Sequence, residues 1–178
     1  MDVAAAVELL RPLITGEGGA WADIGAGSGI FTRALARLLG SSGVVYAVDR
    51  DRAAVGRLES LPVDPAAARV VAKQGDLTGD LSLPKLDGVV LANTLHYVPH
   101  TEQAGALIRI AALLPPAGRL ILAEYDGRPA NRWVPYPVPM TRLVELAISA
   151  GLSRPEVTAT QPSSFGGVLY LAGMRKLS

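Results

Sequence analysis

The sequence of 178 residues contains no cysteine and only two histidines. Without cysteine, the chain can form no disulfide framework, no thiolate nucleophile and no cysteine-ligated zinc site. Two histidines are too few for a histidine-rich metal site, so we expect no bound metal. Any catalysis must therefore come from other groups.

Dense runs of Lys and Arg are also missing, and the formal net charge is only +1. Such a chain lacks the electrostatic footprint of a duplex-binding protein, so nucleic acid is not expected as a partner, although a small RNA stays open. No apolar run approaches the roughly 18 residues of a membrane span. The first residues include Asp2 and Glu8 but no Lys or Arg, unlike a signal peptide. We expect a cytoplasmic protein with no membrane contact, either a monomer or a homodimer.

What the sequence does have is apolar residues, at 49% of the total. That content is enough for a single domain whose core covers both faces of a sheet. Apolar strands and amphipathic helices alternate along the chain, which favours a doubly wound parallel α/β sheet. The expected strands are 21–24, 44–48, 69–72, 88–92 and 119–124, and the expected helices are 3–14, 30–39, 51–60, 101–114 and 141–150. Residues 75–85 are rich in Gly, Asp, Ser and Pro and predict a crossover without a helix.

The last part of the chain breaks this alternation. Strands are expected at 156–160 and 167–174, with only the short turn 161–165 between them. Two strands that close in sequence form an antiparallel hairpin.

The most informative segment carries three glycines at alternate positions, Gly25, Gly27 and Gly29, between a strand end and a helix. Glycine lets the backbone turn sharply and approach a ligand closely, and the helix N-terminus then favours an anionic or polar group. A dinucleotide-binding turn would need a small residue at position 30, where this chain has Ile30. A tight turn with no ligand is the alternative interpretation.

Asp23 stands two positions before Gly25, and the resulting acid-x-G-x-G-x-G pattern resembles motif I of the class I S-adenosylmethionine-dependent methyltransferases. The resemblance implies a Rossmann-like, three-layer αβα fold with seven strands in the order 3-2-1-4-5-7-6, the last strands forming the antiparallel hairpin. We expect one such domain over residues 1–178. An N-terminal helix and turn occupy 1–18 and either pack on the sheet edge or cover the cofactor, and a Pro-rich loop at 127–139 lies on the substrate side.

Asp49 ends the second expected strand, at the spacing from the glycines where a carboxylate can accept hydrogen bonds from both ribose hydroxyls. The alternative is that Asp49 caps the helix that starts near Asp51. Arg50, beside it, would suit a phosphorylated ribose.

The resemblance implies further contacts with S-adenosylmethionine as the cofactor. It places Asp76 on the adenine amino group and the backbone of Leu77 near the ring, although Gly75-Asp76 is also an ordinary turn dipeptide. Asp23 would organise the glycine turn and hold the methionine ammonium group. The implied cofactor site consists of Asp23, Gly25, Ala26, Gly27, Gly29, Asp49, Arg50, Asp76, Leu77 and Asn93.

Because a sulfonium methyl group is already reactive, such an enzyme must align a nucleophile in line with the bond that breaks and exclude water. The fourth strand is followed by Asn93-Thr94-Leu95-His96-Tyr97 and not by Asn-Pro-Pro-aromatic, which counts against an exocyclic base amine or a glutamine amide as acceptor. Histidine titrates near neutral pH, so His96 is the candidate catalytic base. Alternatively, His96 is part of the pocket wall.

The candidate substrate residues are Tyr97, Glu124, Tyr125, Arg128 and Trp133. The last two lie in the Pro-rich loop at 127–139, on the carboxyl side of the sheet where substrate must enter. Arginines there would suit a carboxylate or phosphate on the acceptor. A packed surface connection is the alternative for this loop.

Together these features predict a methyltransferase that acts on an oxygen or nitrogen atom of a small molecule. Two other classes remain as alternatives: a non-catalytic cofactor-binding subunit, and an NAD(P)-dependent oxidoreductase. Ile30, the terminal hairpin and the lack of a Tyr-x-x-x-Lys pair argue against the oxidoreductase.

Overall fold

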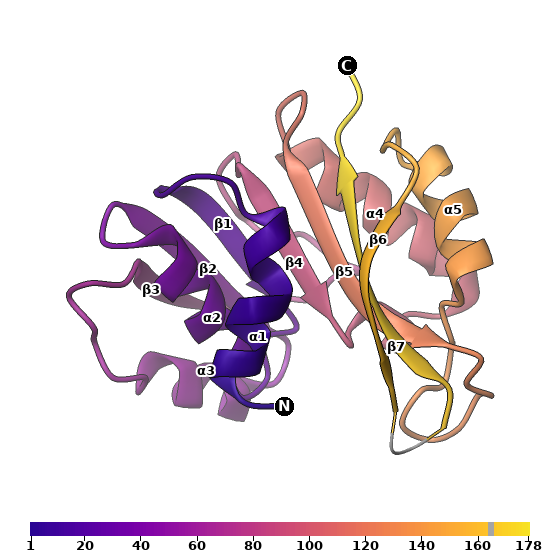
Figure 1. Cartoon of the computed structure of the whole chain (residues 1–178), viewed down its shortest axis with the longest axis horizontal. Helices are drawn as coiled ribbons and strands as arrows, with labels where there is room; N and C mark the ends of the chain where they lie inside the picture. The colour runs from indigo at the N-terminus through magenta and orange to yellow at the C-terminus, as the bar shows by residue number, and fades with distance from the viewer. Residues whose placement is uncertain (164–165) are drawn as a thin grey trace.

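The computed structural model describes residues 1–163 and 166–178, which form a seven-stranded sheet in the order β3-β2-β1-β4-β5-β7-β6 (Figure 1). The five strands β1 to β5 pair in parallel, and β7 runs antiparallel to both β5 and β6. The predicted strand order and terminal hairpin are therefore confirmed. The strands are β1 (Gly19–Ile24), β2 (Gly43–Asp49), β3 (Arg69–Gln74), β4 (Gly88–Ala92), β5 (Arg119–Asp126), β6 (Glu156–Pro162) and β7 (Val168–Arg175).

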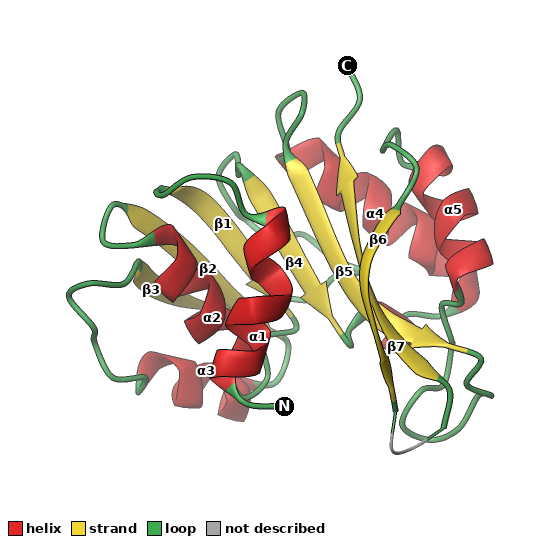
Figure 2. Cartoon of the chain, viewed as in Figure 1, coloured by secondary structure: helices red, strands yellow, loops and turns green. Residues whose placement is uncertain are grey.

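Helices cover both faces of this sheet, which gives three layers (Figure 2). One face carries α1 to α3, and the opposite face carries α4 and α5. The helices are α1 (Val3–Leu10), α2 (Ile30–Leu39), α3 (Arg52–Glu59), α4 (His100–Leu113) and α5 (Met140–Ser149), with 3-10 turns η1 (Arg11–Leu13) and η2 (Leu95–Tyr97). The crossover from β3 to β4 contains no helix, as expected.

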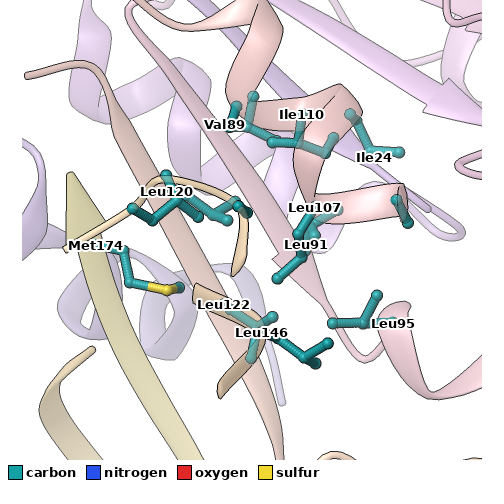
Figure 3. Packing of buried hydrophobic residues seen from close by; sticks show 14 of the residues in the cluster. Ile24, Val89, Leu91, Leu95, Leu107, Ile110, Leu120, Leu122, Leu146 and Met174 are labelled. Carbon is teal, nitrogen blue, oxygen red and sulfur yellow. The ribbon is translucent and has the colours of Figure 1, made fainter. Parts of the chain in front are cut away.

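The central strands are apolar throughout because both of their faces are buried. In β4, Val89 and Leu91 pack against Leu107 and Ile110 of α4 (Figure 3). Val90, between them, points to the other face and packs in the cluster under α1 and α2. Alternate residues of one strand thus hold helices on opposite sides of the sheet.

The N-terminal helix belongs to the core and not to the ligand side. Its residues Ala6 and Leu10 are fully buried in a cluster with Trp21 of β1 and Leu35 of α2. The helix therefore packs on one face of the sheet over the central strands β1, β4 and β5, and lies neither at the sheet edge nor over the cavity, the two positions that were predicted.

Several element boundaries differ from the prediction, and two of these differences involve prolines. The first α-helix ends at Leu10, because Pro12 has no N–H to continue the helix and begins a 3-10 turn instead. Gln161 and Pro162, expected in the turn of the hairpin, belong to edge strand β6, where a proline is tolerated. Two further residues of that expected turn, Ser164 and Phe165, lie outside the described residues.

None of the helices in the described part of the chain combines the length and the hydropathy needed to cross a bilayer.

Candidate functional site

A cavity of about 540 Å³ lies at the carboxyl ends of β1 to β4, where the strand order reverses between β1 and β4. Open α/β sheets bind ligands at this position, and the volume suits a small molecule. The register brings the strand ends together, since Ile24 pairs with Val48 and Asp49 pairs with Gln74. Eight of the predicted residues line the cavity: Gly25, Gly27, Asp49, Arg50, Asp76, Leu77, Asn93 and Tyr97.

The three glycines have three different reasons for lacking a side chain. Gly25 has a φ of +78°, and a Cβ there would overlap the side chain of Thr94, so its space serves the protein and not a ligand. Gly29 has a φ of +76° and packs against Leu58 and Leu61. Only Gly27 lines the cavity with open space where its Cβ would be, so close approach of a ligand is expected at this glycine alone.

Asp49 connects the end of β2 to the glycine turn. One carboxylate oxygen accepts a hydrogen bond from the N–H of Gly27 at 2.8 Å, and the other accepts from the N–H of Asp51 at 2.9 Å. Asp51, and not Asp49, caps α3 through the N–H of Ala53. The capping alternative for Asp49 is therefore wrong, and its carboxylate is fixed at the cavity wall with lone pairs left to accept further bonds.

Asp23 is only 2% exposed and lies behind the glycine turn, outside the cavity lining. Its carboxylate accepts a bond of 2.6 Å from the hydroxyl of Thr32 on α2. Burial raises the pKa of Asp23 from 3.8 to about 6, against the opposing effect of the Thr32 hydrogen bonds. The bond to Thr32 joins the end of β1 to α2 across the glycine turn, and the contact with a methionine ammonium group stays a prediction.

Asp76 and Leu77 line the cavity directly after β3. The backbone N–H and the hydroxyl of Thr78 both donate to one Asp76 oxygen, at 2.8 and 2.6 Å. These two bonds, followed by the charges of Arg50 and Arg109, lower the pKa of Asp76. The turn interpretation of Gly75-Asp76 is thus correct, and it is compatible with ligand binding because the turn presents an ionised carboxylate to the cavity.

Asn93 combines two unusual features at the end of β4. Its φ is +54°, a left-handed conformation that is uncommon outside glycine. Its side-chain carbonyl oxygen Oδ1 is buried and has no hydrogen-bond partner among the described residues. An unsatisfied buried acceptor is costly, and this one belongs to a residue that lines the cavity at the end of β4.

His96 and Glu124 form a buried pair behind the cavity wall. The ring nitrogen Nδ1 of His96 lies 2.7 Å from Glu124 Oε2, and the backbone N–H of His96 donates to Oε1 at 3.1 Å. The two side chains are 2% and 1% exposed. Glu124 is therefore buried against His96 and lies outside the cavity lining, so the structure does not bring it to the position predicted for a substrate contact. His96 does not itself line the cavity; its neighbour Tyr97, 44% exposed, does.

The remaining predicted substrate residues lie outside the cavity lining. The ring of Tyr125 is 6.1 Å from that of His96, and the guanidinium of Arg128 stacks at 4.6 Å over Tyr125. A continuous series of side-chain contacts therefore runs from Tyr97 through His96 and Tyr125 to Arg128. Trp133 is separate from this series, 61% exposed and paired with the guanidinium of Arg132.

Several hydrogen bonds fix the second half of the loop at 127–139 to the rest of the protein, among them those from two buried side chains. Gln103, fully buried on α4, donates to the carbonyls of Val98 and Tyr136, both at 3.1 Å. Tyr170 of β7 donates its hydroxyl to the carbonyl of Val138 at 2.7 Å. The packed-connection interpretation thus holds for this half of the loop, while Asn131, Arg132 and Trp133 are exposed.

Sequence reasoning missed several residues of this region. Thr94 and Glu102 line the cavity, and Thr32 and Gln103 support it. Thr32 had a readable signal, because it is a polar residue on the apolar side of α2. The other lining residues not predicted are Ile24, Gly75, Thr78, Val98 and Pro99.

Comparison with solved structures identifies the class of fold. Magnesium protoporphyrin IX methyltransferase from Synechocystis PCC 6803, solved with bound S-adenosylhomocysteine, superposes with a TM-score of 0.76 at 19% identity, covering 98% of this chain and 81% of that one. A 1,6-didemethyltoxoflavin-N1-methyltransferase from Burkholderia thailandensis gives 0.73 at 22% identity, with 99% and 78% coverage. An S-adenosylmethionine-dependent methyltransferase from Methanosarcina mazei gives 0.74 at 16%, with 95% and 97% coverage. The fold is that of the S-adenosylmethionine-dependent methyltransferases.

The sequence defines the family more directly. The model of the methyltransferase domain family matches residues 22–118, more than half of the chain. The chain belongs to this family. A search of curated proteins found no match.

Proposed function

We propose that the protein, as a single domain over residues 1–178, binds S-adenosylmethionine and transfers its methyl group to an oxygen or nitrogen atom of a small molecule. The observation that carries the proposal is the fixed Asp49 carboxylate beside Gly27, at the switch point of a methyltransferase sheet. Membership in the methyltransferase family favours this function over the oxidoreductase alternative.

The residues around the cavity fit the cofactor. Asp49 would bind the ribose hydroxyls, and Asp76 with Leu77 would bind the adenine, as the family resemblance implies. Gly27 leaves room for close approach, and Asn93 would contact the cofactor as part of the cavity lining. Bound there, the cofactor would supply a sulfonium methyl group, so no covalent enzyme intermediate is needed.

The acceptor would enter on the side of Tyr97 and the loop at 127–139. Tyr97 would hold it against the cavity and exclude water, while the charge of Arg128 suits a carboxylate or phosphate on it. His96 would take up a proton from a hydroxyl or ring N–H acceptor. Two of the structural neighbours are named for small-molecule acceptors, magnesium protoporphyrin IX and 1,6-didemethyltoxoflavin, which supports a small-molecule acceptor here.

The test is transfer of a tritiated methyl group from S-adenosylmethionine to a panel of phenols, carboxylic acids and N–H heterocycles. We expect at least one acceptor to be labelled by the wild-type protein and not by Asp49→Ala. Glu145→Gln, an exposed change on α5, is the control and should label the same acceptor. Cofactor binding without transfer to any member of the panel would contradict the enzymatic proposal and support the non-catalytic subunit.

A further inference from the structure

The buried pair of His96 and Glu124 joins the ends of two neighbouring strands, β4 and β5. Both oxygens of Glu124 are used by the same residue, one by the backbone N–H of His96 and one by its Nδ1. A carboxylate committed in this way determines both where the His96 backbone lies and how its ring is oriented.

The pair also bears on which ring nitrogen of His96 carries the proton. A carboxylate can only accept hydrogen bonds, so with Glu124 in that form Nδ1 of His96 donates to Oε2. In a neutral imidazole the lone pair is then on the other nitrogen, Nε2. No atom of the described residues is hydrogen-bonded to Nε2, although the ring is only 2% exposed.

The surroundings of the ring connect this lone pair to the candidate site. The ring of Tyr97, which lines the cavity, is centred 4.4 Å from the His96 ring. On the β5 side, the ring of Tyr125 is centred 6.1 Å from the His96 ring, and the guanidinium of Arg128 stacks over it. His96 is therefore between the cavity wall and the loop where the acceptor is proposed to enter.

We propose that Glu124 is a positioning residue: it holds His96 in the Nδ1–H tautomer and thereby leaves Nε2 to accept the proton of the methyl acceptor. This inference rests on the proposed function. As the acceptor's O–H or N–H bond breaks, its proton passes to Nε2 and the electron pair left behind forms the new bond to the methyl carbon. The bond between that carbon and the cofactor sulfur breaks with its electrons staying on sulfur, and Nε2 later returns the proton to water.

The tautomer can be measured directly by two-bond ¹H–¹⁵N NMR on protein with labelled histidine, at about pH 8.5, above the ordinary titration range of histidine. His100→Asn assigns the spectrum, because the chain has only two histidines. Wild type should show a protonated Nδ1 and a bare Nε2 for His96. In Glu124→Gln one of the two oxygens is replaced by an NH₂ group, which cannot face the backbone N–H because both are donors. The satisfied arrangement therefore places the NH₂ group against Nδ1. Nδ1 must then accept a hydrogen bond, which puts the ring proton on Nε2.

The control for the loss of one charge is Glu145→Gln, which should keep the wild-type tautomer. A wild-type His96 with its proton on Nε2, or a Glu124→Gln variant with an unchanged tautomer, would overturn the proposal.

A second variant distinguishes proton transfer to His96 from a purely structural role of the His96–Glu124 pair. In His96→Asn the side-chain amide can still donate to Glu124 in place of Nδ1, but nothing replaces Nε2. With the acceptor found in the panel, we expect kcat to fall about 10² to 10⁴-fold, while the Kd for S-adenosylhomocysteine stays within about twofold. If His96→Asn keeps wild-type turnover, the pair has only a structural role and the proposal is wrong. Failure of wild type to bind S-adenosylhomocysteine would instead contradict the proposed function, and the tautomer measurement does not depend on it.

Discussion

A single buried carboxylate, Asp23, ties the glycine turn to the helix that follows it. Its carboxylate accepts a hydrogen bond from the Thr32 hydroxyl, and burial raises its pKa to about 6. A buried acid of this kind contributes little stability when ionised, which suggests that it is kept for the geometry of the turn.

The sign of its effect on stability follows from linkage. Between pH 3.8 and about 6 the folded protein binds more protons at Asp23 than the unfolded chain does, so Asp23 makes stability fall as pH rises through this window. Asp23→Asn removes this titration and can keep the bond to Thr32. We subtract the unfolding free energy of wild type from that of Asp23→Asn at each pH. We expect this difference to be about 2 kcal/mol larger at pH 7.5 than at pH 4.5, because the variant does not lose stability through the titration of Asp23.

Urea unfolding of both proteins at the two pH values measures this difference. The other carboxylates are shared and cancel in the comparison, and Glu145→Gln serves as an exposed control. An equal difference between variant and wild type at both pH values would show that Asp23 has an ordinary pKa.

The packing of Thr94 against Gly25 is a second contact between single residues far apart in sequence. Gly25→Ala combines a left-handed backbone, which costs about 1 to 2 kcal/mol outside glycine, with overlap against Thr94. In a Thr94→Ala background we expect the cost of Gly25→Ala to fall by at least about 1 kcal/mol. Thermal or urea unfolding of the four proteins in this cycle gives the coupling. Gly27→Ala, which has the same backbone sign but open space, should show no coupling to Thr94.

At the scale of elements, the loop at 127–139 is held to the sheet chiefly where Tyr170 of β7 meets Val138. Tyr170 is fully buried, and burial together with the charges of Glu124 and Asp126 raises its pKa far above the ordinary value, so its hydroxyl donates to Val138 at all accessible pH. Tyr170→Phe leaves the Val138 carbonyl without its donor. We expect a loss of about 1 to 3 kcal/mol in unfolding free energy.

Hydrogen exchange should locate this effect, with faster exchange at residues 134–138 than in wild type. The control is Tyr46→Phe on β2, because the Tyr46 hydroxyl has no hydrogen bond to the described residues. If Tyr170→Phe leaves exchange in this part of the loop unchanged, other contacts hold the loop.

Local patterns were enough to predict the elements themselves. Continuous apolar runs identified the parallel strands, and the helix after the glycine turn has the predicted bounds, Ile30–Leu39. Strand ends were less readable: β3 runs on to Gln74 because it pairs along its whole length with β2. That extension depends on a neighbour in the sheet and not on the residues of β3.

Part of the candidate site was predictable because parallel strands bring their carboxyl ends to one edge of the sheet. Asp49, Asp76 and Asn93 could be assigned to this edge one strand at a time. The pairing of His96 with Glu124 could not, because it depends on the depth and rotamer of two side chains 28 residues apart. For the same reason Glu124 was assigned to substrate although the fold buries it.

At the scale of the whole molecule, the two sides of the cavity differ in how strongly they are supported. The family match covers residues 22–118, which include the glycine turn, Asp49, Asp76 and Asn93. Arg128, Trp133 and the β6–β7 hairpin follow this segment (Figure 1). The cofactor side of the cavity therefore lies within the matched segment, and the loop at 127–139 is where this chain can differ from its relatives.

Titration calorimetry with S-adenosylhomocysteine tests the central claim most directly. We predict saturable one-to-one binding by the wild-type protein, no binding of NADH, and a Kd about 30-fold weaker or more for Asp49→Ala, since a charge-assisted bond to the ribose is lost. Glu145→Gln should bind as wild type does. Tight binding of NADH, with none of S-adenosylmethionine or S-adenosylhomocysteine, would contradict the account.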